Sequence, residues 1–227
     1  MILAKFAFVL ILGYILGSIP FGLLVSRLQT GKDVRHYGSG KTGATNVLRT
    51  AGRKAAIVSV IGDILKGTLS VFLAGLIFGN DLLVIGNFGM GTLMAQVLAA
   101  LAAIAGHNWS VFLKFKGGRG VATFFGGLLA LCPPAALIGA EVLFVSAGIT
   151  RYASVGSISG IISAYVILVP LTIIYKFPLE YLTYALIGGL VIITMHKDNI
   201  NRLVAGTERK LGVKAEKVNT TPEKLGA

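Results

Sequence analysis

Residues 121–150, VATFFGGLLALCPPAALIGAEVLFVSAGIT, determine how many times this chain can cross a membrane. The stretch carries one charged residue, Glu141, and is longer than the roughly 20 apolar residues that a single span needs. Proline removes a backbone donor and clashes with the preceding helical turn, so Cys132-Pro133-Pro134 predicts a break. We therefore expect two passes here, the first of them too short for a full span.

Five other windows are long and apolar enough to cross a bilayer. They are residues 2–26, 55–78, 91–113, 155–175 and 179–195. With 55% hydrophobic and 13% charged residues, the 227-residue chain is too apolar for an ordinary soluble domain. We predict an all-α, polytopic integral membrane protein with about seven transmembrane helices. Residues 2–26 lack a clear signal-peptide cleavage site, so we expect this helix to be retained.

The formal net charge of +12 is unevenly distributed. Most of the 21 basic residues lie in residues 27–54, in residues 114–120 and beyond residue 196, whereas the loops around 80–87 and 176–180 hold a single Lys. Basic loops stay cytoplasmic, so we expect the N-terminus outside and the C-terminus in the cytoplasm. Only two passes through residues 121–150 satisfy this rule, which favours seven helices over six. We predict one transmembrane catalytic domain, residues 1–210, and a flexible basic tail, residues 211–227.

Two glycine-rich, basic stretches interrupt the apolar sequence: residues 38–46, GSGKTGATN, and residues 114–120, KFKGGRG. Glycine lets backbone N–H groups approach an anion closely, and the adjacent Lys and Arg side chains add positive charge. The Gly-Lys-Thr in the first stretch is not a nucleotide-binding loop, because the glycine needed five residues earlier is replaced by Arg35. Together the stretches indicate a phosphate-bearing substrate at the bilayer surface. A plain interhelical turn is the alternative for the first.

Polar side chains beside the first stretch can bind such a substrate. Ser39, Thr45 and Asn46 offer hydrogen bonds. Arg49 offers a bidentate guanidinium for phosphate, and on a helix it would share a face with Thr45, four residues earlier.

Polar residues near the other spans leave more than one interpretation open. His196 and Asn199 would project from one helical face just after the last span, either toward a substrate or as a cap at the membrane boundary. His107 is better explained as a hydrogen-bonded structural histidine. Asp63 and Lys66 either form an internal ion pair or line a functional cavity. The serines in residues 151–160 mostly suit helix packing.

No feature of the sequence indicates a bound metal or cofactor. The single Cys132 lies in an apolar run, and no Cys/His cluster has metal-ligand spacing. We expect no cofactor, no metal ion and no nucleic-acid partner. The basic tail is explained by orientation and by contact with anionic membrane lipid.

Seven segments together resemble the bacterial acyl-phosphate:glycerol-3-phosphate acyltransferase family (PlsY). They occur in order, as residues 17–22, 38–46, 63–67, 106–108, 114–123, 154–157 and 196–200. The resemblance implies a seven-helix enzyme that moves a fatty acyl group from acyl phosphate to the 1-hydroxyl of glycerol 3-phosphate. The products would be phosphate and lysophosphatidic acid, in the first step of phospholipid synthesis. Two positions depart from the family: Lys41 stands where it usually has Asn, and Arg119 where it often has Lys.

The resemblance also implies a site, a location and partners. By matched position the catalytic candidates are Ser39, Arg49, Arg119, Ser157, His196 and Asn199. The substrate-binding candidates are Gly38, Gly40, Gly43, Thr45, Asn46, His107, Lys116, Gly117, Gly118 and Gly120. The expected location is the bacterial inner membrane, with the site at its cytoplasmic face. An enzyme that supplies acyl phosphate is a candidate partner.

Two other functions compete with this interpretation. A transporter of a phosphorylated metabolite would need a charged route through the spans, and only Asp63, Lys66 and Glu141 lie deep within them. An acyltransferase that uses a thioester donor would carry a His-x-x-x-x-Asp motif. None of the three histidines is followed by Asp five positions later, which leaves the acyl-phosphate reaction favoured.

Overall fold

The computed structural model describes residues 2–85 and 88–217 and is almost entirely helical. Its α-helices are α1 (Ile2–Ser18), α2 (Phe21–Thr30), α3 (Ala44–Ala51), α4 (Arg53–Phe78), α5 (Thr92–Asn108), α6 (Val121–Leu131), α7 (Pro133–Thr150), α8 (Ala153–Ile173), α9 (Leu179–Met195) and α10 (Lys197–Val204). Two short 3-10 helices, η1 (Val34–His36) and η2 (Val111–Leu113), lie in the connections. Strands β1 (Leu83–Ile85) and β2 (Phe88–Met90) form a small antiparallel hairpin.

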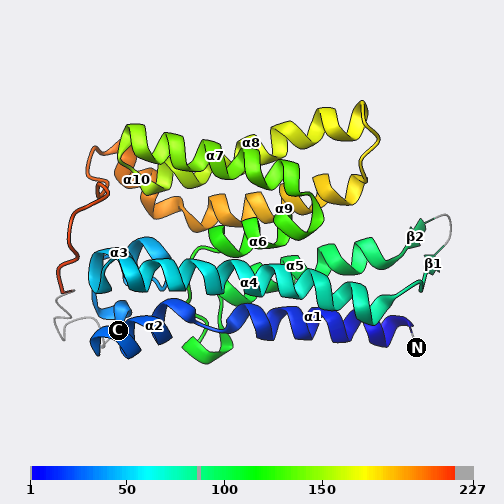
Figure 1. Cartoon of the computed structure of the whole chain (residues 1–227), viewed down its shortest axis with the longest axis horizontal. Coiled ribbons are helices and arrows are strands. Elements are labelled where there is room, and N and C mark those ends of the chain that lie inside the picture. Colours follow the sequence, from blue (N-terminus) through cyan, green and yellow to red (C-terminus); the bar gives the residue numbers. More distant parts are fainter. Residues whose placement is uncertain (1, 86–87, 218–227) are drawn as a thin grey trace, which may run out of the picture.

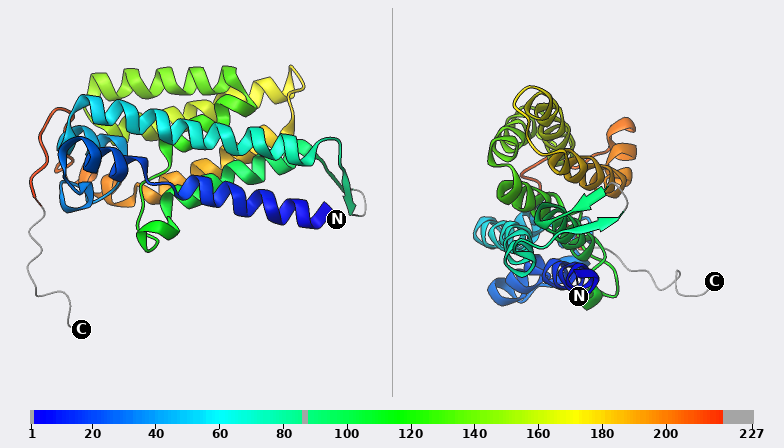
Figure 2. Two further views of the ribbon diagram at one scale, coloured as in Figure 1. Left: turned by 60° about the horizontal axis from the view of Figure 1, so that its bottom comes forward. Right: turned by 90° about the vertical axis from the view of Figure 1, so that its right-hand side faces the viewer.

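The long helices run along one axis, and loops of different charge lie at its two ends (Figures 1 and 2). α2, α3 and α10 lie at one end with the described part of the C-terminal segment. The β1–β2 hairpin, the start of α1 and the turn between α8 and α9 lie at the other end. The two loops poor in basic residues thus share one end, and two of the three basic segments share the opposite end.

The helices have the length and composition of membrane spans. Within the described residues five segments are both long enough and apolar enough to cross a membrane. They are Ile2–Thr30, Arg53–Phe78, Thr92–Leu113, Pro133–Thr150 and Ala153–Ile173. α9 and α10 give a sixth if this pair, bent by 58°, is counted as one span. α6 is a shorter apolar helix. The predicted helical membrane architecture is confirmed, whereas the number seven and the orientation of the termini stay predictions.

The break between α6 and α7 lies where the two prolines predict it. α6 ends at Leu131, and α7 begins at Pro133, in the first turn, where the missing N–H costs no hydrogen bond. Cys132 closes α6 by donating its N–H to the carbonyl of Leu128 at 2.7 Å. With 11 residues, α6 is about 16 Å long, roughly half of the hydrocarbon thickness. The expected break and the short first helix are confirmed, whereas its passage through the membrane stays a prediction.

The helices pack with their backbones in contact because small residues face one another. Gly13 and Gly17 of α1 lie against the backbone of Ala99 and Ala103 of α5. Gly67 makes the same kind of contact between α4 and the backbone of α6. Lipid tails are as apolar as the side chains, so close packing of this kind, rather than escape from water, holds membrane helices together.

Tyr184 joins α9 to the centre of the bundle. Its ring stacks on that of Phe124 of α6, with centroids 5.3 Å apart, and its hydroxyl donates to the Phe124 carbonyl at 2.8 Å. Both side chains are fully buried. This contact fixes α9 beside α6, so the C-terminal end of α9 lies next to the loop that leads into α6. Arg119 in that loop donates from Nε to the carbonyl of Met195, 3.3 Å away.

Replacing Gly17 by alanine tests the backbone contact between α1 and α5. A Cβ atom there would lie 2.6 Å from the Cα of Ala103. The Cβ is fixed to its own backbone and the Cα belongs to the other helix's backbone, so no bond rotation can separate them. We expect Gly17→Ala to lower the free energy of unfolding by about 1–3 kcal/mol, measured as a lower melting temperature in detergent. Gly148→Ala in α7 is the matched control, because a Cβ at Gly148 meets nothing within 4 Å. Equal melting temperatures for the two variants would contradict this account.

Candidate active site

A cavity of about 340 Å³ lies where seven helices and several connecting segments meet. It is lined by the loop before α3, by α3 itself, by α4, α5, α6, α7, α8 and α10, and by residues just after α10. Eleven of the residues proposed from the sequence line it: Ser39, Gly43, Thr45, Asn46, Arg49, His107, Arg119, Gly120, Ser157, His196 and Asn199. All six catalytic candidates are therefore brought together from distant parts of the chain, although their roles stay predictions.

The loop of residues 38–46 keeps its shape through the side chain of Asn46. The Asn46 Nδ2 lies 2.9–3.0 Å from the carbonyls of Val34, Tyr37 and Lys41. Its Oδ1 accepts the N–H of Ser39 at 3.1 Å. Asn46 is buried and its polar atoms bond within the protein, so it organises the loop. Its expected contact with the substrate stays a prediction.

The first two glycines of this loop, Gly38 and Gly40, do not line this cavity. Gly38 and Gly40 have φ of 55° and 68°, a left-handed conformation that glycine adopts without strain. The Gly38 N–H donates to the Glu216 carbonyl, and the Gly40 N–H donates to the Tyr37 carbonyl, both at 3.0 Å. Both amides already have acceptors within the protein, so the expected use of these two glycines as an anion cradle stays a prediction.

The second glycine-rich stretch has a packing role that the sequence analysis did not predict. The N–H groups of Gly117 and Gly118 donate to the carbonyls of Asn108 and His107, both at 3.0 Å. A Cβ on Gly118 would collide with the His107 ring, and one on Gly117 with the backbone at the end of α5. Neither glycine, nor Lys116, lines the cavity. Only Arg119 and Gly120 from this stretch do so.

Two arginines give one side of the cavity its positive charge. Arg49 donates from Nη2 to the carbonyls of Arg209 and Lys210 at 2.9 and 3.1 Å, while its buried Nε has no partner among the described residues. Burial, together with the charge of Arg202, lowers the pKa of Arg119 to about 10. At neutral pH Arg119 therefore remains a cation, and this region favours an anion.

His196 occupies the bend between α9 and α10. Its side chain is buried, and Nδ1 lies 2.8 Å from the carbonyl oxygen of Ile192. A carbonyl can only accept, so Nδ1 carries the hydrogen, and Nε2 of the neutral ring is left as the proton acceptor. Ser157 lines the same cavity and donates its hydroxyl to the Ala153 carbonyl at 2.9 Å, which leaves its oxygen able to accept.

An ion-paired cluster lies among the spans on the cavity's inner side. Asp63 Oδ1 lies 2.7 Å from Lys66 Nζ and 3.4 Å from His107 Nδ1, and Lys66 also donates to the Ile19 carbonyl at 3.0 Å. Asp63 and His107 line the cavity. Both interpretations left open by the sequence therefore hold for Asp63, which is paired and borders the cavity.

Ser154, Arg202 and Glu208 line the cavity but were not among the site residues proposed from the sequence. Glu208 accepts hydrogen bonds from Asn199 Nδ2 at 2.6 Å, Arg202 Nε at 2.8 Å and Ser154 Oγ at 3.0 Å. One signal was available: Gly206 follows a helix and suits the left-handed turn that ends it, with φ of 69°. That turn sends the chain back toward the cavity.

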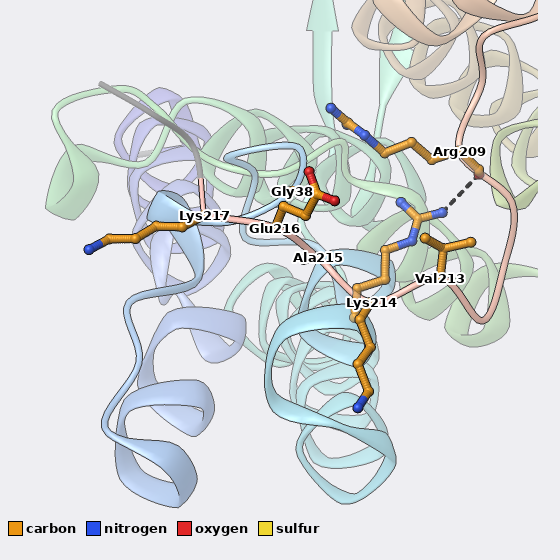
Figure 3. A pocket seen from close by; sticks show the side chains of 8 residues that line it. Gly38, Arg209, Val213, Lys214, Ala215, Glu216 and Lys217 are labelled. Carbon is orange, nitrogen blue, oxygen red and sulfur yellow. Dashed lines mark hydrogen bonds between the residues drawn. The ribbon is translucent and has the colours of Figure 1, made fainter. Parts of the chain in front are cut away.

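The residues after α10 cross the same end of the bundle and border a second cavity of about 380 Å³ (Figure 3). Leu211 donates its N–H to the Arg151 carbonyl at 2.7 Å, and Ala215 donates to the Arg49 carbonyl at 3.1 Å. Lys217 forms a β-bridge with Tyr37. Residues 211–217 of the predicted flexible tail thus follow a path held by backbone hydrogen bonds. The rest of that tail, residues 218–227, lies outside the described residues.

Comparison with known sequences gives consistent matches. A family model described as glycerol-3-phosphate acyltransferase matches residues 7–206. A protein named glycerol-3-phosphate acyltransferase 3 from Dehalococcoides mccartyi is 60% identical over 215 residues, which are 95% of this chain and 100% of that protein. The glycerol-3-phosphate acyltransferase of Rippkaea orientalis is 42% identical, with 90% of this chain and 92% of that protein aligned.

A solved structure is also similar to this fold. It is a crystal structure of PlsY, an integral membrane glycerol 3-phosphate acyltransferase, in its glycerol 3-phosphate form. The TM-score is 0.78 at 36% identity, over 91% of this chain and 96% of that chain. A second form of PlsY, with lysophosphatidic acid, gives a TM-score of 0.77. By sequence and by fold, this chain belongs to the glycerol-3-phosphate acyltransferase family.

Proposed function

We propose that this enzyme transfers a fatty acyl group from acyl phosphate to the 1-hydroxyl of glycerol 3-phosphate, giving lysophosphatidic acid and phosphate. The observation that carries the proposal is a single cavity with both cationic and apolar lining. Arg49 and Arg119 supply positive charge for phosphate groups, and Phe125, Leu143 and Phe144 supply an apolar wall for an acyl chain. The glycerol 3-phosphate and lysophosphatidic acid forms of the related PlsY support the acceptor and the product.

The chemistry needs few protein groups. Acyl phosphate is a mixed anhydride with a good leaving group, so no covalent nucleophile is required. The acceptor hydroxyl oxygen bonds to the acyl carbon, the anhydride C–O bond breaks, and phosphate leaves with that oxygen. The guanidinium groups of Arg49 and Arg119 stabilise the negative charge that develops on the carbonyl and phosphate oxygens. His196, Asn199 and Ser157 orient the acceptor.

Two groups can accept the hydroxyl proton. One is Nε2 of His196, which keeps its lone pair because Nδ1 donates to the Ile192 carbonyl. The other is an oxygen of the donor's own phosphate. In either case the hydroxyl loses its proton as the new ester bond forms. No reactant other than the two substrates is needed.

We further propose that the protein lies in the bacterial inner membrane with the cavity facing the cytoplasm. The end of the bundle that carries α3, α10 and the tail is rich in Lys and Arg, which favours the cytoplasmic side and contact with anionic lipid. Glycerol 3-phosphate is soluble and acyl phosphate is a lipid, so a cavity at this boundary suits both. An enzyme that makes acyl phosphate remains the candidate partner.

A comparison of donors tests the reaction. Purified protein in detergent receives labelled glycerol 3-phosphate with acyl phosphate, with acyl-CoA or with acyl carrier protein, and labelled lysophosphatidic acid is measured. Of the three donors, we expect only acyl phosphate to give product, because phosphate is a good leaving group and the cationic lining stabilises it. Turnover only with a thioester would overturn the assignment of acyl phosphate as the donor. If the folded protein turned over none of the donors, the proposed acyltransferase activity itself would be wrong.

Replacing His196 by alanine separates the two proton acceptors. If Nε2 takes the proton, kcat falls by about 100-fold or more, while KM for glycerol 3-phosphate changes little. His36→Ala is the matched control, because His36 lies in η1 and does not line the cavity. Full kcat in the His196 variant would assign the proton to the donor phosphate instead.

Substitutions at Arg119 test the cationic lining. A charge-assisted hydrogen bond contributes about 1.5–3 kcal/mol, so we expect Arg119→Ala to lower kcat/KM by roughly 10- to 100-fold. Arg119→Lys keeps the charge and should retain most of the activity, as the lysine often found at this position in the family implies. Kinetics with varied acyl phosphate and varied glycerol 3-phosphate provide the measurement. A lysine variant as impaired as the alanine variant would show that geometry, not charge, matters there.

A further inference from the structure

Glu208 is the most completely bonded carboxylate at the cavity, and the reaction proposed above does not use it. Its side chain is 5% exposed. One oxygen accepts from Asn199 Nδ2 and Ser154 Oγ, and the other accepts from Arg202 Nε. These donors come from the first turns of α8 and from α10, so Glu208 links two elements that border the cavity.

The chain reaches this position through a left-handed turn at the end of α10. Gly206 donates its N–H to the Leu203 carbonyl at 3.1 Å, and Thr207 donates to the Arg202 carbonyl at 2.8 Å. This pair of bonds is the Schellman arrangement that ends many helices at glycine. It reverses the chain after α10, so that Glu208 faces the helix it has just left.

The carboxylate determines which way the Asn199 amide points. Burial alone would raise the pKa of Glu208, but hydrogen bonds from Asn199, Arg202 and Ser154 outweigh it, and the pKa lies below its usual value. An ionised carboxylate can only accept hydrogen bonds, so the NH₂ group of Asn199 must face it. The Asn199 Oδ1 is consequently turned away. It is buried and has no hydrogen-bond partner within the described part of the chain.

We propose that Glu208 is a positioning residue that fixes the Asn199 amide so that its oxygen accepts a hydrogen bond from a hydroxyl of glycerol 3-phosphate. An unpaired buried acceptor is costly unless a ligand completes it, and Asn199 lines the cavity. The inference rests on the proposed function and extends it. It assigns Asn199 to the glycerol hydroxyls, as an acceptor, and not to the phosphate, as a donor.

A competing role for Glu208 predicts the opposite kinetic effect. A carboxylate near Arg49, Arg119 and Arg202 would also repel a substrate phosphate or occupy its place. If repulsion dominated, neutralising Glu208 would strengthen the binding of glycerol 3-phosphate. If positioning dominates, neutralising Glu208 lowers kcat/KM for glycerol 3-phosphate.

Glu208→Gln distinguishes the two roles with little change in size. The charged Arg202 donor attracts the glutamine oxygen more strongly than the neutral Asn199 does, so the glutamine NH₂ turns toward Asn199 and the Asn199 amide reverses. We expect kcat/KM for glycerol 3-phosphate to fall about tenfold, with KM for acyl phosphate unchanged. Glu216→Gln is the matched control, because it makes the same charge change in the same segment, on an exposed side chain outside this cavity.

A double-mutant cycle shows whether Glu208 acts through Asn199. In an Asn199→Ala background, Glu208→Gln should cost no further activity, because the group it orients is already gone. A second probe is propyl phosphate, which carries the phosphate but no hydroxyl. We expect it to inhibit the wild type and Asn199→Ala equally, since Asn199 does not bind phosphate. This comparison needs no Glu208 variant and decides the point even if Glu208→Gln fails to fold.

Three results would overturn the inference while leaving the reaction intact. They are a lower KM for glycerol 3-phosphate in Glu208→Gln, an equal loss in both backgrounds of the cycle, and weaker inhibition by propyl phosphate in Asn199→Ala. Wild-type protein that turns over no substrate would instead remove the proposed function. The two failures are therefore distinguishable.

Discussion

Direct contact between helix backbones is the constraint on which the rest of this structure depends. Glycines bring α1 against α5 and α4 against α6 with no side chain between them. In the same bundle Asp63 of α4 lies 3.4 Å from His107 near the end of α5. A larger residue at such a contact would separate the helices and the charged groups together. Packing and polar chemistry are thus coupled in this bundle, and neither can be changed alone.

The fold was largely predictable because its signals are local. Apolar windows about 20 residues long mark the spans, and the proline pair marks the break before α7. Each of these patterns determines the structure of the stretch of chain in which it occurs. The short hairpin β1–β2 and the bend at His196 were not foreseen, since a few apolar residues in a loop and a polar residue after a span fit several structures equally well.

The site was predictable only in part, because glycine has more than one physical use. The loop of residues 38–46 borders the cavity, but its shape depends on Asn46, which the sequence analysis treated as a substrate ligand. In residues 114–120 two of the glycines, Gly117 and Gly118, allow close contact with the end of α5, a role that the sequence analysis did not predict. Composition cannot separate these uses, since the partner that explains each glycine is set by the tertiary structure.

Glu208 was missed for a related reason. Glu208 is one of several acids in the basic segment after the last span, and nothing distinguishes it until the turn at Gly206 brings it beside Asn199 and Ser154. Its partner Ser154 is 54 residues away in the sequence. Hydrogen bonds of this kind are invisible to periodicity and to charge counting, although they decide how a cavity presents its polar atoms.

The hydrogen bonds from Arg49 to the carbonyls of residues 209 and 210 have a thermodynamic consequence. A free arginine side chain holds about 2 kcal/mol of rotamer entropy, which binding must remove. Here the tail has already immobilised the guanidinium during folding, while its Nε still lacks a partner among the described residues. An arriving anion thus meets a donor whose conformation no longer has to be restricted.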